Sequence, residues 1–94
     1  HFLDLKKEEN CLTEKGLRVY IEKNSLDHTR LGVSVSKTEA NAVKRNKFKR
    51  KIKEVVRGIK KEGNFDIYIV GRREGTALNF SELRKIIRTH PKLN

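Results

Sequence analysis

Residues 30–71 read RLGVSVSKTEANAVKRNKFKRKIKEVVRGIKKEGNFDIYIVG, and this stretch decides the fold. Its two ends, residues 30–36 and 65–71, are rich in β-branched and apolar residues and are expected to be strands. Between them, apolar residues recur at the three- and four-residue spacing of a buried helical stripe. The stripe consists of Phe48, Ile52, Val55, Val56 and Ile59. Asn41 is expected to cap the start of this helix, and Gly63–Asn64 to end the segment.

Another strand is predicted upstream, at residues 17–23, where apolar and polar residues alternate. Leu17, Val19 and Ile21 would point to one face, and Arg18, Tyr20 and Glu22 to the other. Residues 24–29 are expected to form a turn, and residues 1–9 the end of a helix. The strand at 30–36 would present Gly32, Ser34 and Ser36 on one small, flat face. The strand at 65–71 is expected to be central and covered on both faces.

The C-terminal part is expected to contain a loop at residues 72–78 and then one more helix. The residues NFSE at 79–82 resemble a capping box with Asn79 as the cap. An inner face would run from Leu83 to His90, and Pro91 would stop the helix. The order of elements predicts an α+β fold, a small sandwich in which helices pack on one sheet.

Length and composition favour a single domain at residues 1–94 with a polyanionic partner. The chain has a net charge of +11 and a pI near 10.1. No apolar run has the length of a membrane-spanning helix, and Trp is absent, so a membrane is not expected as partner. Cys11 is the only cysteine, which rules out an intrachain disulfide and an all-cysteine zinc site. The first residues contain no secretory signal, so a cytoplasmic location is expected, and a start at His1 predicts a truncated N-terminus.

Positive charge is concentrated in the helical stretch at residues 44–61. Ten of these eighteen residues are Lys or Arg and only Glu54 is acidic, which leaves nine of the eleven net charges there. With Ile52 facing inward, Lys47, Arg50, Arg57 and Lys61 would point outward, and Arg45 toward the sheet. A solvated surface helix would usually mix signs, so this density favours binding of a polyanion, with the solvated helix as the plainer alternative.

The sequence RLGVSVSKTEANAVKRNKFKRKIKEVVR at 30–57 resembles the bacterial ribonuclease P protein subunit. In that family a strand R-h-G-h-S-V-S-K, where h is apolar, leads into a helix G-N-A-V-x-R-N-R-x-K-R-x-h-R-E. The resemblance implies a sandwich like domain 2 of ribosomal protein S5, with a left-handed β-α-β crossover through the basic helix. It also implies an accessory subunit of a ribonucleoprotein endoribonuclease, which binds the catalytic RNA and the 5′ leader of precursor tRNA. The RNA would bind Mg²⁺ and perform the hydrolysis, and the protein alone would be inactive.

The resemblance also implies which residues bind RNA, and assigns none of them to catalysis or direct metal binding. Those expected to bind RNA are Lys37, Asn41, Lys44, Arg45, Asn46, Lys47, Lys49, Arg50, Lys53 and Arg57. Asn46 would lie near an Mg²⁺ ion held by the RNA. Those expected to line the leader-binding cleft are Phe2, Tyr20, Ser34, Lys37 and Arg45. An aromatic side chain beside small residues and a lysine suits a stacked single strand.

Several positions depart from the family pattern. Lys47 replaces the second Arg of the R-N-R motif and so loses bidentate phosphate geometry. Ala40 replaces the usual Gly, and Glu39 places an acid beside the helix N-terminus, where it is unfavourable for phosphate. Lys6 stands where a second cleft aromatic is usual.

Three other functions remain open at this point. A ribosomal or other structural RNA-binding protein would need the basic helix but not the cleft residues. A nuclease acting alone would need clustered carboxylates or a histidine base, and the acids and histidines are scattered. Major-groove DNA binding lacks a helix-turn-helix or dimer pattern. Protein oligomerisation is not required by any of these interpretations.

Overall fold

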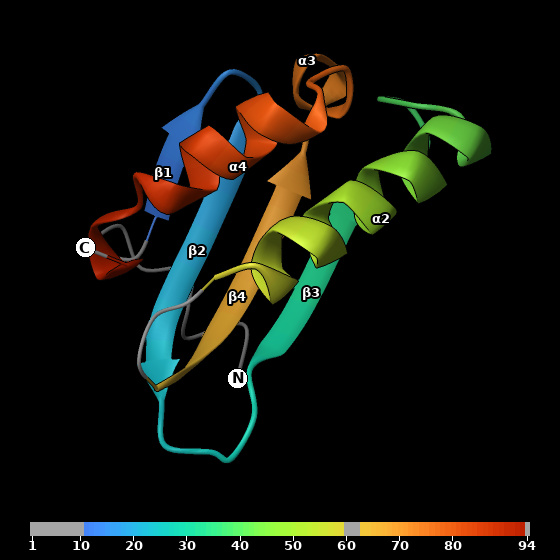
Figure 1. Cartoon of the computed structure of the whole chain (residues 1–94). Helices are drawn as coiled ribbons and strands as arrows, with labels where there is room; N and C mark the ends of the chain where they lie inside the picture. The colour runs from blue at the N-terminus through green and yellow to red at the C-terminus, as the bar shows by residue number, and fades with distance from the viewer. Residues whose placement is uncertain (1–10, 60–62, 94) are drawn as a thin grey trace.

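The computed structural model describes residues 11–59 and 63–93. Four strands form one sheet, and the helices α2 and α4 lie together on one of its faces (Figure 1). The strands are β1 Cys11–Glu14, β2 Leu17–Asn24, β3 Arg30–Val35 and β4 Asn64–Gly71. The helices are α2 Ala42–Arg57, α3 Arg73–Thr76 and α4 Phe80–Arg88, followed by the 3-10 helix η2 Pro91–Leu93. The α+β class expected from the sequence is confirmed.

The strand order is β1-β2-β4-β3, which makes β4 central, as predicted. β2 pairs antiparallel with β1 and β4, whereas β3 and β4 run parallel and are joined by α2. In Figure 1, α2 lies in front of the sheet and the chain passes from β3 to β4 on its left. The β3–α2–β4 crossover is therefore left-handed, the rare hand for such a connection.

The core lies between this sheet face and the helices. Leu17, Val19 and Ile21 of β2 are completely buried, as their alternation predicted. They join Ile67 and Ile69 of β4 in one apolar cluster with residues of both helices. The helical residues of the cluster are Phe48, Ile52, Val55, Leu83, Ile86 and Ile87. β4 is covered fully on this face only, because Tyr68 and Val70 on the other face are half-buried.

The helix ends follow local capping chemistry. The side chain of Asn41 accepts a hydrogen bond from the backbone N–H of Lys44 at 2.9 Å, as expected of the N-cap. α2 ends at Arg57 with Gly58 as its C-cap, earlier than the predicted Gly63–Asn64. In the described part of the chain, no helix combines the length and apolar character needed to cross a membrane.

The capping box before α4 is also present. The Asn79 side chain accepts from the N–H of Glu82 at 2.8 Å, and the Glu82 carboxylate accepts from the N–H of Asn79 at 3.2 Å. α4 ends at Arg88, and Pro91 begins η2 instead of stopping α4 directly. His90 is completely buried, as its assignment to the inner face predicted.

Besides η2, two further elements were not predicted. β1 forms a hairpin with β2 through Lys15 and Gly16, whose φ angles of 47° and 78° lie in the left-handed region. The segment at 72–78, expected to be a loop, contains the one-turn helix α3. The helix expected at residues 1–9 lies outside the described residues.

Candidate nucleic-acid interface

The helix α2 carries most of the residues expected to bind RNA. Phe48, Ile52 and Val55 bury one face of α2 against the sheet and α4, so the cations on the other faces remain in solvent. The exposed members of the expected set on α2 and at its cap are Asn41, Lys44, Asn46, Lys47, Lys49, Arg50, Lys53 and Arg57. Lys37, also exposed, lies in the loop between β3 and α2.

Arg45 differs from these residues because it is only half-exposed. Its Nη1 donates a hydrogen bond to the carbonyl oxygen of Ala40 at 3.4 Å. This contact turns the guanidinium toward the loop that precedes α2. The position agrees with the prediction that Arg45 lies in phase with the buried stripe near the N-terminal end of the helix.

Arg57 is partly neutralised within α2. Its Nη1 donates to Oε1 of Glu54 at 2.9 Å, one turn earlier. Both side chains are exposed, and exposed pairs of this kind contribute little stability. Among the described residues, Glu54 is therefore the acid that competes with an RNA phosphate for a cation of α2.

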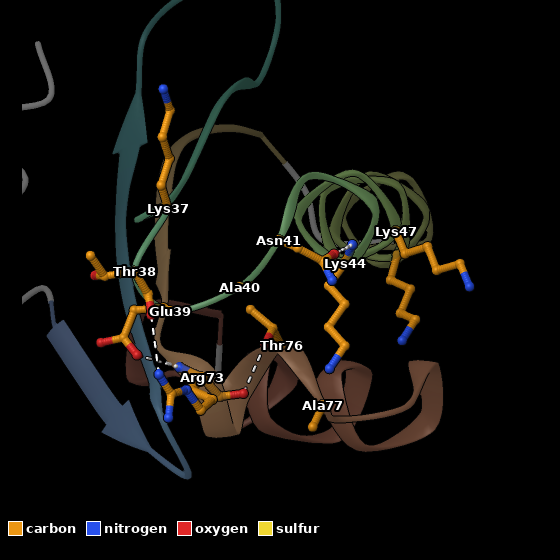
Figure 2. A pocket seen from close by; sticks show the side chains of 11 residues that line it. Lys37, Thr38, Glu39, Ala40, Asn41, Lys44, Lys47, Arg73, Thr76 and Ala77 are labelled. Carbon is orange, nitrogen blue, oxygen red and sulfur yellow. Dashed lines mark hydrogen bonds between the residues drawn. The ribbon is translucent and has the colours of Figure 1, made fainter.

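A cationic hollow of about 590 Å³ lies beside the N-terminal half of α2 (Figure 2). It is bounded by α2, by the loop before it, and by α3. Its lining includes four residues expected to bind RNA, namely Lys37, Asn41, Lys44 and Lys47. Lys51 and Arg73 also line it, and sequence reasoning missed both. Lys51 lies seven residues after Lys44 on one helix flank, and this spacing could have indicated it.

Glu39 ties the loop before α2 to the segment at α3. Its Oε1 accepts from Nε of Arg72 at 2.7 Å, and its Oε2 accepts from the backbone N–H of Arg73 at 3.2 Å. Nη2 of Arg73 donates back to the carbonyl oxygen of Thr38 at 3.1 Å. The hydrogen bond from Arg72 lowers the pKa of Glu39 below its ordinary value. Glu39 thus acts as a clamp and does not pair with the lysines of α2.

The residues expected in the leader-binding cleft lie in two places. Tyr20 and Ser34 belong to the sheet face turned away from α2 and α4, the open face, because their neighbours Val19 and Val33 pack into the core. Lys37 follows the end of β3, and Arg45 lies on α2, on the other side of the sheet. Phe2 lies outside the described residues.

Tyr20 has an aromatic neighbour that the sequence analysis did not single out. Tyr20 pairs with Tyr68 across β2 and β4, and their ring centroids are 6.2 Å apart. Only 8% of Tyr20 is exposed, whereas Tyr68 is half-buried. Ser34, on β3, is in register with Val70, two residues further along β4. Tyr68 is therefore the more accessible aromatic residue of the pair on the open face.

The open face also holds a structural ion pair. Asp66 accepts from Nε and Nη2 of Arg30, its partner in the β3–β4 register, and from Nδ2 of Asn24 at 2.9 Å. The hydrogen bonds from Arg30 are the main reason that the pKa of Asp66 falls to about 2. Over residues 11–59 and 63–93, no three His, Cys, Asp or Glu side chains gather where they could hold a metal ion.

Comparisons with known proteins cover nearly the whole chain. The family model described as Ribonuclease P matches residues 1–92. The ribonuclease P protein component of Clostridioides difficile is 33% identical over 90 residues, which are 93% of this chain and 79% of that protein. The same component of Thermotoga petrophila is 37% identical over 76 residues, 78% of this chain and 64% of that protein.

Solved structures agree with these sequence matches. The Staphylococcus aureus RNase P protein aligns with a TM-score of 0.75 at 31% identity, over 98% of this chain and 86% of that one. The RNase P protein from Thermotoga maritima aligns with a TM-score of 0.73 at 30% identity, over 94% of this chain and 86% of that one. The sequence matches and the structural matches are thus proteins of the same kind. The chain belongs to the family of bacterial ribonuclease P protein components.

Proposed function

We propose that this chain is the protein subunit of a ribonuclease P ribonucleoprotein and binds its catalytic RNA through α2. The observation that carries the proposal is the surface of α2, where Lys and Arg side chains stand in solvent around a helix with only one acid. Lys and Arg supply most contacts to nucleic-acid phosphates, largely without regard to sequence. The partner selected by such a surface is a folded RNA with many phosphates in reach.

The open face of the sheet is proposed to bind the 5′ leader of precursor tRNA. The half-buried ring of Tyr68, backed by the buried ring of Tyr20, offers an aromatic surface there, and the small side chain of Ser34 lies on the neighbouring strand β3. Bases of a single strand stack on such platforms with little sequence preference. Lys37, at the end of β3, would meet the leader phosphates where the strand leaves the sheet.

The hydrolysis itself is assigned to the RNA. In the family that the sequence resembles, Mg²⁺ ions held by the RNA supply the chemistry, and the protein acts by binding. Positive charge on α2 would reduce repulsion between the catalytic RNA and precursor tRNA, which lowers the Mg²⁺ concentration needed. Asn46, exposed on α2, is proposed to face that region of the RNA. The subunit would act in the cytoplasm, and this function does not require a second copy of the protein.

The test is cleavage of a precursor tRNA by a bacterial ribonuclease P RNA at low Mg²⁺, with and without the protein. Accurate 5′ cleavage should appear only when the RNA and the protein are combined. Salt-sensitive RNA binding without cleavage would instead favour a structural RNA-binding protein. A protein-alone reaction is a necessary arm, because one Staphylococcus aureus RNase P protein in the comparison is described as a mutant with defective mRNA degradation activity. Cleavage in that arm would overturn the assignment of hydrolysis to the RNA.

Two matched double variants test whether the cations of α2 bind the RNA or whether any positive charge on the surface would do so. Arg50→Gln combined with Lys53→Gln removes one Arg and one Lys from α2, and should weaken binding to the catalytic RNA. Arg84→Gln combined with Lys85→Gln removes the same charges from the exposed side of α4 and is the control. Equal losses in both would mean that net charge alone binds the RNA.

The leader contact is tested with precursor tRNAs that differ only in leader length. A leader long enough to cross the sheet should bind the holoenzyme more tightly than a one-nucleotide leader. Tyr68→Leu should reduce this difference and leave the affinity for the catalytic RNA unchanged. An unchanged difference would remove the open face from the proposal.

A further inference from the structure

The cationic hollow beside α2 has a composition that is unfavourable in the free protein. Lys44, Lys47, Lys51 and Arg73 line it together with Lys37. Within residues 11–59 and 63–93, none of these five side chains makes an ion pair with an acid. Like charges around one hollow repel each other, and a bound anion would remove that repulsion.

The three lysines of α2 are brought together by helical spacing. Lys47 and Lys51 follow Lys44 by three and seven residues, which puts the three lysines on one flank of the helix, facing α3. Figure 2 shows Lys44 extending from α2 across the hollow toward Thr76 and Ala77. Lys51 spans the same gap, because its Nζ donates to the carbonyl oxygen of Leu78 at 3.1 Å. An ammonium has three protons, so Lys51 keeps two for a ligand.

Arg73 lines the hollow from the α3 side, and its guanidinium is turned toward Thr38 (Figure 2). Its backbone N–H is held by Glu39 and its Nη2 by the carbonyl oxygen of Thr38. The remaining guanidinium protons are left for an acceptor. Glu39, the one acid in the lining, already accepts from Arg72, and the lowered pKa keeps it ionised in that pair. The acid therefore positions Arg73 and leaves the lysines uncompensated.

The hollow, at about 590 Å³, has room for more than one anionic group. The N-terminal end of α2 adds partial positive charge, with no acid in its first turn. We propose that the hollow binds two or more neighbouring phosphates of a bent RNA backbone, with Lys44, Lys47, Lys51 and Arg73 as ligands. This proposal deepens the proposed function and rests on it for the identity of the anion as RNA.

This site adjoins the outward face of α2, with Lys47 at the boundary between the two. Asn46 lies about 140° around the helix from Lys51, at about 100° per residue. The protein would therefore contact RNA on two sides of α2, and the partner backbone would turn around its N-terminal half. Lys51 and Arg73 would be binding residues that neither the charge run nor the family pattern singled out.

The first experiment titrates inorganic tripolyphosphate into the ¹⁵N-labelled protein and follows backbone amide shifts. The shifts should concentrate at residues 37–41 and 73–77. Lys51→Gln combined with Arg73→Gln should weaken tripolyphosphate binding by about tenfold or more, since hydrogen bonds to charged groups are the strong ones. The control, Arg84→Gln combined with Lys85→Gln on α4, should bind as the wild type does. Shifts spread over α4, or equal weakening in both variants, would overturn the site.

The second experiment measures binding to the catalytic RNA as a function of salt. Loss of two phosphate contacts should reduce the slope of log affinity against log salt by about 1.4 to 1.8. Lys44→Gln combined with Lys47→Gln, both exposed, tests the same hollow if the first variant folds poorly. An unchanged slope in variants that fold, with wild-type cleavage intact, would refute the hollow and leave the proposed function standing. A wild-type protein that fails to support cleavage would refute the function, while the tripolyphosphate titration would still report on the hollow.

Discussion

Gly71 allows α2 to lie close to the sheet, and its replacement by alanine is the sharpest test of the core. Gly71 is the last residue of β4 and lies under the ring of Phe48. A Cβ at this position would be 2.7 Å from Cε2 and 2.8 Å from Cζ of Phe48. Carbon atoms in good contact are about 3.5 to 4.0 Å apart. Phe48 is completely buried, so its ring has no open space in which to retreat.

The cost of Gly71→Ala can be worked from this geometry. An added methyl group in a well-packed core costs about 1–3 kcal/mol. Replacing glycine also restricts the unfolded chain, which offsets about 0.4–1 kcal/mol of that cost. At the middle of both ranges the net loss is about 1.3 kcal/mol, and for a domain of this size the melting temperature should fall by roughly 5–10 °C.

Urea and thermal denaturation followed by circular dichroism measure this loss. Gly58→Ala is the matched control, because a Cβ there would meet only carbonyl oxygens at 3.5 and 3.6 Å, ordinary contact distances. Phe48→Leu should partly rescue Gly71→Ala, so that the double variant loses less than the sum of the two single losses. Strict additivity, or a Gly71→Ala protein as stable as Gly58→Ala, would refute the close packing of α2 on β4.

Three further outcomes are expected. Asp66, with a pKa near 2 against an ordinary 3.8, stabilises the fold at neutral pH, and this stability should be lost as pH falls from about 4 to 2. The loss should be about 1–2 kcal/mol after allowance for the solvent exposure of Arg30, and a pH series of urea melts should show it in the wild type but not in Asp66→Asn. Asn41→Ala should cost about 1 kcal/mol in the same assay, since it removes the side-chain cap of α2; no loss would mean that solvent replaces the cap. Gly16→Ala should destabilise the hairpin, because φ is 78° and the new Cβ would lie 2.6 Å from the backbone N of Gly75; stability equal to the wild type would contradict this turn geometry.

The periodicity of apolar residues in the sequence was sufficient to predict the main strands and helices. The alternation in LRVYIEK predicted β2 and its buried face, and the stripe from Phe48 to Val55 predicted the inward side of α2. Asn41 and Asn79 were recognisable as caps because a side-chain acceptor precedes each helical pattern. These features depend on neighbours within one turn or one strand, which a sequence shows directly.

The features that were missed depend on contacts between distant segments. β1 is four residues long, too short for a clear alternation, and its turn has Lys15 where Asn or Asp is usual. The cationic hollow requires Arg73 and Lys51 to line the same space, and the parallel pairing of β3 and β4 brings the segments that follow these strands together. The pairing of Tyr20 with Tyr68 likewise follows from the register of strands far apart in the chain.

The pairing of β2 with β4 has a consequence for the order of events during synthesis. Asn24 pairs with Asn64 and Leu17 with Gly71, so β2 is made 40 to 54 residues before its central partner. α4, which covers the same face, ends at Arg88, 64 residues after Asn24. At about 5–20 residues per second, β2 emerges from the ribosome roughly 3 to 13 seconds before its cover is complete. During that interval the apolar face of β2 in the nascent chain is uncovered. The basic residues of α2 have also been synthesised by then, before β4 and α4, which hold α2 in place, are complete.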